Sequence, residues 1–171
     1  MKKTIILAHP KNYGGKRTKQ SVKFIVIHYT ANDGDTAVNN AKFFQNNVTK
    51  SSAHYFVDDS GVVKSVYLLN VAWSVGGKKY PTCKTTGGGK FYNKCTNTNS
   101  INIELCDTKK NGVIYPSTKT INNALKLTRQ LMKEYHVPKE NVIRHFDVTG
   151  KPCPAYWTDL KTWKKEFWSK L

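Results

Sequence analysis

The feature that most constrains this chain is the segment 142–157, where a short apolar run ends in a histidine and a cysteine follows eight residues later. His145 closes the strand-like run, and Cys153 lies in a turn rich in glycine and proline, two residues after Lys151. A distant histidine, His28, ends a second apolar run that begins at Phe24. The chain therefore has to fold so that three segments, each with a candidate metal ligand, can meet.

Imidazole and thiolate are both good donors to zinc, and this residue set points to a particular kind of site. Two histidines and one cysteine leave the fourth tetrahedral position open for a water, which a catalytic rather than a structural site needs. The sequence thus predicts a zinc hydrolase with His28, His145 and Cys153 as ligands. Two alternatives stay open from the residues alone: each histidine is a satisfied core residue, or Cys153 is a nucleophile with His145 as its base.

The length and composition indicate a single globular domain. The chain has 171 residues, of which 39% are hydrophobic and 12% aromatic, so it can bury a core and is not intrinsically disordered. Its start imitates a signal peptide, but His9 and Pro10 interrupt the apolar stretch after Ala8. No segment approaches the ~20 apolar residues of a membrane helix. We expect synthesis in the cytoplasm without a signal peptide, and no membrane span.

The charge balance predicts attraction to polyanions. Lysine and arginine number 28 against 11 acidic residues, a formal charge of +17. Nucleic acid, an anionic membrane and an acidic cell wall are all candidates, but the sequence has no zinc-finger repeat, basic zipper or RNP-type aromatic signature. Four cysteines are too few for a disulfide scaffold, and the sequence leaves open whether Cys83 and Cys95 pair.

Hydrophobic patterns predict a mixed sheet covered by helices. Strands are expected at Phe24–Tyr29, His54–Val57, Val62–Tyr67, Ser100–Cys106 and Val142–His145, the second and third forming a hairpin. Within 100–106, Ile101, Ile103 and Leu105 should face one way, and Asn102, Glu104 and Cys106 the other. The fold class is therefore mixed α/β, with a central sheet of about five or six strands and about three helices.

Three segments have helical periodicity. The first is capped by Asp35 or Thr36, the second is capped by Thr120 and ends before Pro138, and the third begins near Thr158. The aromatic residues of the third are expected to pack on the sheet, with a basic membrane or wall anchor as the alternative. Residues 78–99, rich in Gly, Thr, Lys and Asn, are expected to form one long surface loop.

Five motifs together resemble a known family, the zinc-dependent N-acetylmuramoyl-L-alanine amidases related to phage amidase lysozymes and peptidoglycan recognition proteins. The motifs are FIVIHYT (24–30), SAHYFVDDSG (52–61), VAW (71–73), NSINIELC (99–106) and RHFDVTGKPCP (144–154). They occur in the family's order and span most of the chain. The resemblance implies a fold like that of the peptidoglycan recognition proteins.

The resemblance also implies roles for individual residues. His28, His145 and Cys153 would hold zinc, Glu104 would act on the attacking water, and Lys151 would stabilise the oxyanion. His54 and Trp73 would contribute more weakly to substrate binding, and core packing is an alternative for His54.

Two departures from the family pattern bear on substrate contacts. Ala53 stands where some relatives have a catalytic tyrosine, which leaves water activation to Glu104. Ser74 stands where many relatives have a histidine after the tryptophan.

The resulting expectation is a single catalytic domain over residues 1–171, without a separate wall-binding domain. It would cleave the amide between N-acetylmuramic acid and L-alanine in bacterial peptidoglycan, with the basic surface binding anionic wall polymers. The enzyme would act at the cell wall, as a phage or prophage endolysin or as an autolysin. The rival interpretation is a noncatalytic peptidoglycan-binding module of the same fold.

Overall fold

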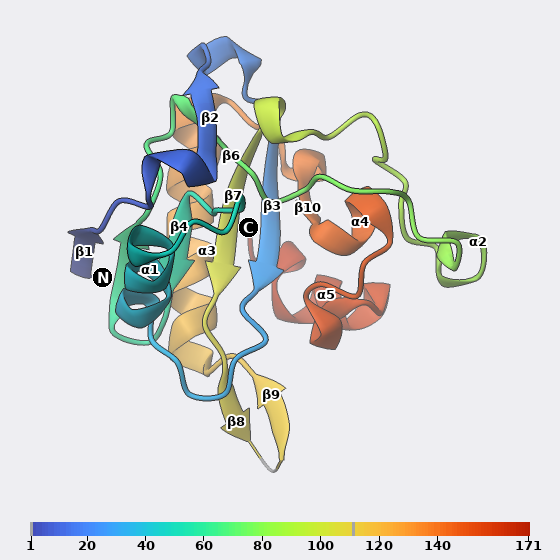
Figure 1. The fold of residues 1–171 in the computed structure, drawn as a ribbon. Coiled ribbons are helices and arrows are strands. Elements are labelled where there is room, and N and C mark those ends of the chain that lie inside the picture. The colour runs from blue at the N-terminus through green and yellow to red at the C-terminus, as the bar shows by residue number, and fades with distance from the viewer. Residues whose placement is uncertain (1, 111) are drawn as a thin grey trace.

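The chain folds around a six-stranded mixed sheet. The computed structural model describes residues 2–110 and 112–171. The sheet strands are β1 (Lys2–Ile5), β3 (Phe24–Tyr29), β4 (Tyr55–Val57), β5 (Gly61–Lys64), β7 (Ser100–Leu105) and β10 (Val142–Arg144). Their order across the sheet is β1-β5-β4-β7-β3-β10 (Figure 1). Strands β4, β7, β3 and β10 run parallel to one another, and β5 and β1 run the opposite way.

Two small antiparallel sheets lie at the ends of the large one. Strand β2 (Tyr13–Lys16) pairs with β6 (Asn70–Ala72), and β8 (Thr108–Lys110) pairs with β9 (Val113–Tyr115). The β8–β9 pair extends away from the rest of the molecule (Figure 1). Strand β6 matters for the site because Trp73 follows it directly.

Five α-helices accompany the sheet within the described residues. They are α1 (Ala37–Asn46), α2 (Cys83–Thr86), α3 (Thr118–Tyr135), α4 (His145–Thr149) and α5 (Leu160–Glu166). Short 3-10 turns lie at Pro10–Asn12, Lys19–Ser21, Asn97–Asn99, Lys139–Asn141, Ala155–Trp157 and Trp168–Lys170. Helix α3 crosses one face of the sheet and α1 lies on the other, which gives three layers (Figure 1).

The larger core lies between the sheet and helices α3 and α5. Ile101, Ile103 and Leu105 point into it, as their alternation predicted, and they join Leu127 and Leu131 of α3 in one cluster. The aromatic side chains of the C-terminal segment join the same cluster, namely Trp157, Trp163 and Phe167. Their burial confirms that the C-terminal aromatics pack on the sheet.

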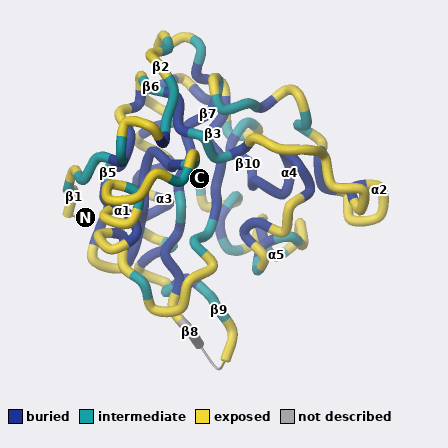
Figure 2. The backbone as a smooth tube through the Cα atoms, in the orientation of Figure 1, coloured by how far each residue is buried: buried dark blue, intermediate teal, exposed yellow. Residues whose placement is uncertain are grey.

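The opposite face of the sheet is less uniformly apolar. Phe56 and Val63 pack against Ala37 and Ala41 of α1. Phe24 and Val26 pack near Val148 of α4, in a cluster that also contains Val75, Cys95 and Ile143. Between these two apolar clusters the sheet presents polar side chains instead. Figure 2 shows that the central strands β4, β7, β3 and β10 are largely buried, whereas the edge strand β1 and most of the α2 segment are exposed.

Several boundaries differ from the sequence-based expectation. Ser117 rather than Thr120 caps α3, because the Ser117 hydroxyl accepts a hydrogen bond from the Thr120 N–H at 3.1 Å. The third expected helix begins at Leu160, capped by Asp159. The predicted strand 62–67 is only Gly61–Lys64, and His145 begins α4 instead of ending β10.

Other expectations are confirmed. Thr36 caps α1, with its hydroxyl accepting from Asn39 N at 3.1 Å, and β4 and β5 form the expected antiparallel pair.

The long segment 78–99 is not one continuous loop, since it contains α2 and a 3-10 turn. All four cysteines are free thiols, which answers the question of Cys83 and Cys95. In the described ranges, no helix combines the length and apolar character needed to span a bilayer.

Candidate active site

Two of the expected site residues are paired by the register of adjacent strands. His28 of β3 lies opposite Glu104 of β7 in the parallel ladder, so both side chains point to the same face of the sheet. His28 Nδ1 and Glu104 Oε1 are 3.8 Å apart. The apolar runs of β3 and β7 thus fix the backbone. His28 and Glu104, near the carboxyl ends of these strands, point to the face of the sheet on which α1 lies.

His145 is held by the junction between β10 and α4. Strand β10 pairs with β3, so its end brings His145 beside His28, with ring centroids 4.8 Å apart. The preceding residue, Arg144, is buried and forms an ion pair with Asp147, with Nη2 and Oδ1 2.6 Å apart. Arg144 Nη1 also donates to the carbonyl of Trp157 at 2.6 Å. These contacts fix the turn in which the histidine lies.

Cys153 comes from the turn after α4. The Phe146 N–H donates to the Cys153 carbonyl at 2.9 Å, and the Cys153 N–H donates to the Lys151 carbonyl at 2.7 Å. Prolines on both sides, Pro152 and Pro154, restrict the backbone further. The thiol is therefore carried by a turn whose shape is set by proline and by main-chain hydrogen bonds.

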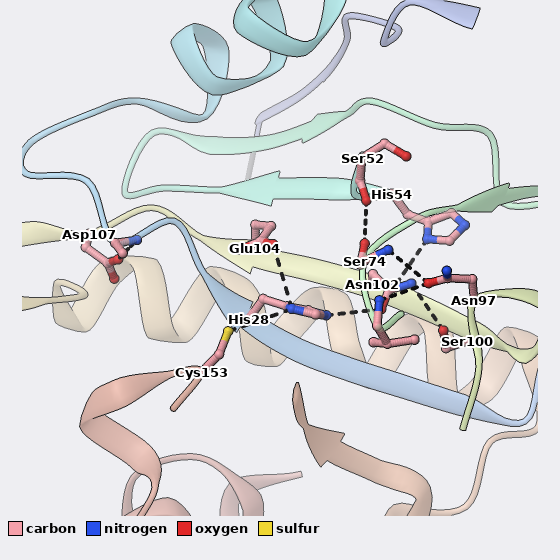
Figure 3. A network of polar contacts seen from close by, with 12 residues as sticks. His28, Ser52, His54, Ser74, Asn97, Ser100, Asn102, Glu104, Asp107 and Cys153 are labelled. Atoms are coloured by element: carbon pink, nitrogen blue, oxygen red, sulfur yellow. Dashed lines mark hydrogen bonds and ion pairs between the residues drawn. The ribbon is translucent and has the colours of Figure 1, made fainter. Parts of the chain in front are cut away.

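The structure brings the three predicted ligands together. Donor atoms of His28, His145 and Cys153 all lie within 4.8 Å of one another, and Cys153 Sγ is 3.8 Å from His28 Nδ1 (Figure 3). Ligand atoms of one tetrahedral zinc ion lie roughly 3.3–3.7 Å apart, so a contraction of roughly 1.1–1.5 Å from the 4.8 Å limit brings all three into range. His145 Nε2 is buried and has no hydrogen-bond partner among the described residues. The arrangement fits a metal ion.

Asn102 is a site residue that the sequence analysis did not single out. Its Oδ1 lies 3.1 Å from His28 Nε2, and its Nδ2 donates to Ser100 Oγ at 3.2 Å (Figure 3). The Ser100 hydroxyl donates in turn to the Thr96 carbonyl. This chain directs the amide oxygen of Asn102 toward His28, so the ring carries its proton on Nε2 and Nδ1 has a free lone pair. The signal in the sequence was the alternation that places Asn102 on the same face as Glu104.

Burial determines the protonation of the three candidate ligands. It lowers the pKa of His28 well below its usual value, with the neighbouring His145 as the next cause. It lowers the pKa of His145 to about 4, with Lys151 contributing. Both rings are therefore neutral near pH 7, as metal ligands must be. Burial raises the pKa of the Cys153 thiol, so metal binding has to displace its proton.

Glu104 lies deep in the site and differs electrostatically from an ordinary glutamate. Burial raises its pKa to about 8, while the positive charge of Lys151 acts in the opposite direction. Its Oε2 is buried without a hydrogen-bond partner in the described part of the chain. A carboxyl group with a pKa near neutrality can both accept and return a proton.

The three candidate ligands and Glu104 line a cavity of about 570 Å³. Lys151, Trp73 and Ser74 also line the cavity, and so do Phe43 and Phe44 of α1. Trp73 is held by Ser52, because the Trp73 N–H donates to Ser52 Oγ at 3.1 Å and the Ser52 N–H donates to the Trp73 carbonyl. The structure thus places Trp73 and Lys151 on the wall of the cavity that contains the three candidate ligands.

His54 belongs to the core and does not line this cavity. Its ring is fully buried, its Nδ1 accepts from the Asn102 N–H at 3.0 Å, and its Nε2 lies 3.1 Å from the Asn70 carbonyl. Arg17 Nη2 is 3.0 Å from the same Nε2. Burial and the Arg17 charge lower the pKa of His54 to about 3. Of the two placements left open by the sequence, the structure favours the core over substrate contact.

The family assignment rests on most of the chain. A family model described as N-acetylmuramoyl-L-alanine amidase, Amidase_2, matches residues 18–156. That range includes every described residue that lines the cavity with the candidate metal ligands. The chain belongs to this family. The resemblance drawn from the five sequence motifs is therefore confirmed.

Curated relatives in this family come from Bacillus. The amidase CwlL of Bacillus licheniformis is 35% identical over 159 residues, which make up 88% of this chain and 42% of CwlL. The amidase CwlA of Bacillus subtilis (strain 168) is 32% identical over 163 residues, or 91% of this chain and 54% of CwlA. The chain thus spans about half the length of the curated relatives that it matches.

Solved structures of related proteins have the same fold. A variant of PlyL superposes with a TM-score of 0.76 at 30% identity, covering 99% of this chain and 98% of PlyL. The catalytic domain of XlyA superposes with a TM-score of 0.75 at 26% identity, covering 99% of both chains. The expected mixed α/β fold of this family is confirmed across nearly the whole chain.

Proposed function

We propose that residues 1–171 act as one catalytic domain, a zinc-dependent N-acetylmuramoyl-L-alanine amidase that lyses bacterial peptidoglycan. The observation that carries the proposal is the convergence of His28, His145 and Cys153 in a cavity where Glu104 Oε1 lies 3.8 Å from His28 Nδ1. Membership in a family of amidases supplies the substrate class. The site of action would be the cell wall.

His28 Nδ1, His145 and Cys153 Sγ would hold the zinc ion. When bound, zinc supplies Lewis acidity that lowers the pKa of water from about 16 toward about 7. Asn102 keeps His28 in the tautomer that offers Nδ1. The thiolate of Cys153 and two neutral rings suit zinc better than they suit a hard cation such as magnesium.

Glu104 and Lys151 would handle the proton and the charge of amide hydrolysis. Glu104, in its ionised form, takes a proton from the attacking water as that water bonds to the lactyl carbonyl carbon. The Lys151 ammonium meets the negative charge that develops on the carbonyl oxygen. When the carbon–nitrogen bond breaks, Glu104 returns the proton to the nitrogen of L-alanine. The products are the free lactyl acid and a peptide with a new N-terminal alanine.

The decisive experiment is a digest of purified peptidoglycan with zinc-loaded protein, with and without a chelator. New N-terminal alanine and new reducing sugar ends are assayed in parallel. We expect alanine termini that disappear with the chelator and return with added zinc, and no new reducing ends. Reducing ends without alanine termini would contradict the amidase assignment.

The second candidate is a noncatalytic peptidoglycan-binding module of the same fold. The site argues against it because Glu104 and the complete ligand set are both present. Sedimentation of the protein with peptidoglycan, without release of alanine termini from metal-loaded protein, would favour this candidate.

A further inference from the structure

A second cavity continues from the first one on the side away from α1. Its volume is about 890 Å³, and it shares Trp73, Ser74, His145 and Lys151 with the cavity that contains the candidate metal ligands. It then extends along the segment 76–81. A molecule that reacts at Glu104 and His28 can therefore continue into this second space without leaving the protein surface.

The two cavities differ sharply in charge. Four lysines line the second cavity, which are Lys50, Lys78, Lys79 and Lys151, and its described lining contains no acidic side chain. In the first cavity Lys151 is the lysine of the lining, and Asp35 and Glu104 oppose it. The high lysine content of the whole chain does not explain this contrast, because the two cavities belong to one cleft. We call the second cavity the lysine groove.

The lysines of this groove are available to a ligand. Lys50, Lys78, Lys79 and Lys151 are exposed. Among the described residues, the structure gives the ammonium groups of Lys50, Lys78 and Lys79 no hydrogen bond or ion pair with the protein. An anion entering the groove would therefore not have to displace a protein carboxylate.

The backbone that carries these lysines is held from both sides. The buried Asn12 accepts hydrogen bonds from Thr49 N and Lys50 N at 2.7 and 3.0 Å, which fixes one wall. On the other wall, Asn97 Oδ1 accepts from Ser74 N and Val75 N at 2.9 Å each. The Tyr80 N–H donates to the Thr149 carbonyl at 2.8 Å. The lysine groove is thus a built feature of the fold, with exposed lysines on walls that backbone hydrogen bonds hold in place.

We propose that the lysine groove binds the carboxylates of the stem peptide and favours stems whose acid groups are free over stems in which they are amidated. The inference rests on the proposed function, since the scissile amide joins a glycan that carries no acid there to a peptide with carboxyl groups beyond L-alanine. Charge complementarity then places the peptide arm toward Lys78 and Lys79. The glycan arm is left to the end of the cleft beside α1.

A wall polymer of phosphodiesters is another anion that lysines attract. The stem peptide is favoured because the groove opens directly into the reaction cavity at His145 and Lys151. Whatever occupies the groove therefore lies next to the bond being cleaved, as the peptide must and a separate polymer need not.

The test uses two soluble muramoyl tripeptides, both with lysine as third residue and with an amidated C-terminus, that differ only in whether the α-carboxyl of D-glutamate is free or amidated. Their hydrolysis is measured at low ionic strength for the unaltered protein and for Lys78→Gln/Lys79→Gln. One exposed lysine–carboxylate pair strengthens binding affinity by a factor of up to about five. We expect the double variant to lose about tenfold in kcat/KM on the free acid, mainly through KM, and less than about twofold on the amide.

The matched control is Lys126→Gln/Lys133→Gln, which makes the same change in net charge. Both of these lysines are exposed on α3, on the far side of the sheet. This control should leave the ratio of the two rates unchanged. Equal cleavage of acid and amide by the unaltered protein, or equal losses on both substrates in the groove variant, would overturn the proposal.

A binding measurement separates this proposal from the proposed function. Calorimetric titration with the stem tripeptides alone, free acid and amide, does not need turnover. If neither muramoyl substrate is cleaved but the free acid peptide binds more tightly and loses that advantage in the groove variant, the amidase assignment fails and the groove assignment stands. If instead the variant loses binding of soluble teichoic acid and still distinguishes the peptides, the stem-peptide assignment is wrong.

Discussion

At the scale of single residues, the site depends on how each polar group is oriented by a neighbour. His28 is useful as a ligand only in one tautomer, and the hydrogen-bond chain through Asn102 and Ser100 selects it. Burial raises the pKa of Glu104 to about 8, close to neutrality, which suits a group that accepts and then returns a proton. Both the tautomer of His28 and the raised pKa of Glu104 therefore depend on neighbouring residues.

Replacing Asn102 should weaken metal binding without removing a ligand. In Asn102→Leu the His28 ring loses its Nε2 partner, and partners of this kind typically change metal affinity about 10–100-fold. The measurement is zinc affinity by competition with a chromophoric chelator. Asn102→Asp keeps an oxygen that accepts from Nε2 and should recover much of the loss. Equal affinities in the leucine variant and the unaltered protein would contradict the role of Asn102.

Replacing Glu104 should separate turnover from metal content. In Glu104→Gln the carboxylate that accepts the proton is gone while the side-chain shape is kept, so we expect kcat to fall about 100-fold or more. Zinc content and sedimentation with peptidoglycan should stay near those of the unaltered protein. The exposed Glu140 offers a control, and Glu140→Gln should retain full activity. Undiminished turnover in Glu104→Gln would assign water activation to another group.

At the scale of elements, the ends of helices and the links between strands depend on particular polar contacts. Helix α3 begins one turn earlier than its apolar periodicity suggests, because Ser117 supplies the cap and Thr120 becomes a buried helical residue. Strands β4 and β7 are joined by His54 as well as by their ladder, since its ring accepts from the Asn102 N–H. Both contacts give predictions for stability.

Removing the cap of α3 should destabilise the fold measurably. The Ser117 hydroxyl satisfies the Thr120 N–H, and replacing such a cap by alanine costs about 1 kcal/mol in free energy of unfolding. Chemical denaturation of Ser117→Ala checks this value. Thr118→Ala is the control, since Thr118 is exposed and follows the cap. A larger loss in the control than in Ser117→Ala would place the cap elsewhere.

His54 should make the metal-free fold sensitive to acid. Its pKa is about 6.5 in an unfolded chain and about 3 in the fold, so its contribution is full above pH 6.5 and is lost as the pH falls toward 3. Below pH 6.5 the unfolded chain binds a proton at this histidine and the folded chain does not, which lowers the free energy of unfolding by up to about 5 kcal/mol across this window. Between pH 6 and 4, free energies of unfolding should fall less steeply in His54→Asn.

The control for this prediction is His136→Asn. His136 is exposed at the C-terminal end of α3 in a left-handed conformation that asparagine also adopts. Replacing His136 should leave the slope of the free energy of unfolding against pH unchanged. Identical slopes for His54→Asn and the unaltered protein would show that His54 is protonated in the fold as readily as in the unfolded chain.

At the scale of the whole molecule, the net charge of +17 is the dominant property. Charge of this size attracts the protein to polyanions over distances set by the ionic strength. The shape of the reaction cavity does not depend on this field. Attraction to the wall and cleavage of the bond should therefore respond differently to salt.

Lysis of whole cells should fall steeply as salt rises, whereas cleavage of a small uncharged muropeptide should change little. The reason is that salt screens attraction between the basic surface and anionic wall polymers, with a Debye length of about 10 Å at 0.1 M. Turbidity of a cell suspension and release of alanine from the soluble substrate, measured from low to high salt, check the difference. Equal salt responses would contradict a role for the surface charge.

Local patterns in the sequence predicted the central strands, two of the long helices and the candidate site residues. Alternation identified β7 and the faces of Ile103 and Glu104, a continuous apolar run identified β3, and helical periodicity identified α1 and α3. Five motifs identified the family. These signals are local, because strand and helix periods are properties of neighbouring residues in the chain.

How these residues meet depends on the strand order and on packing between distant segments. The strand order places β3 between β7 and β10, so the carboxyl ends of parallel strands bring His28, Glu104 and His145 to one place. The same packing moved His54 into the core, revealed Asn102 as the partner of His28, and joined the lysine groove to the reaction cavity. Distances, burial and pKa values arise from contacts between segments far apart in the chain, and no local pattern specifies them.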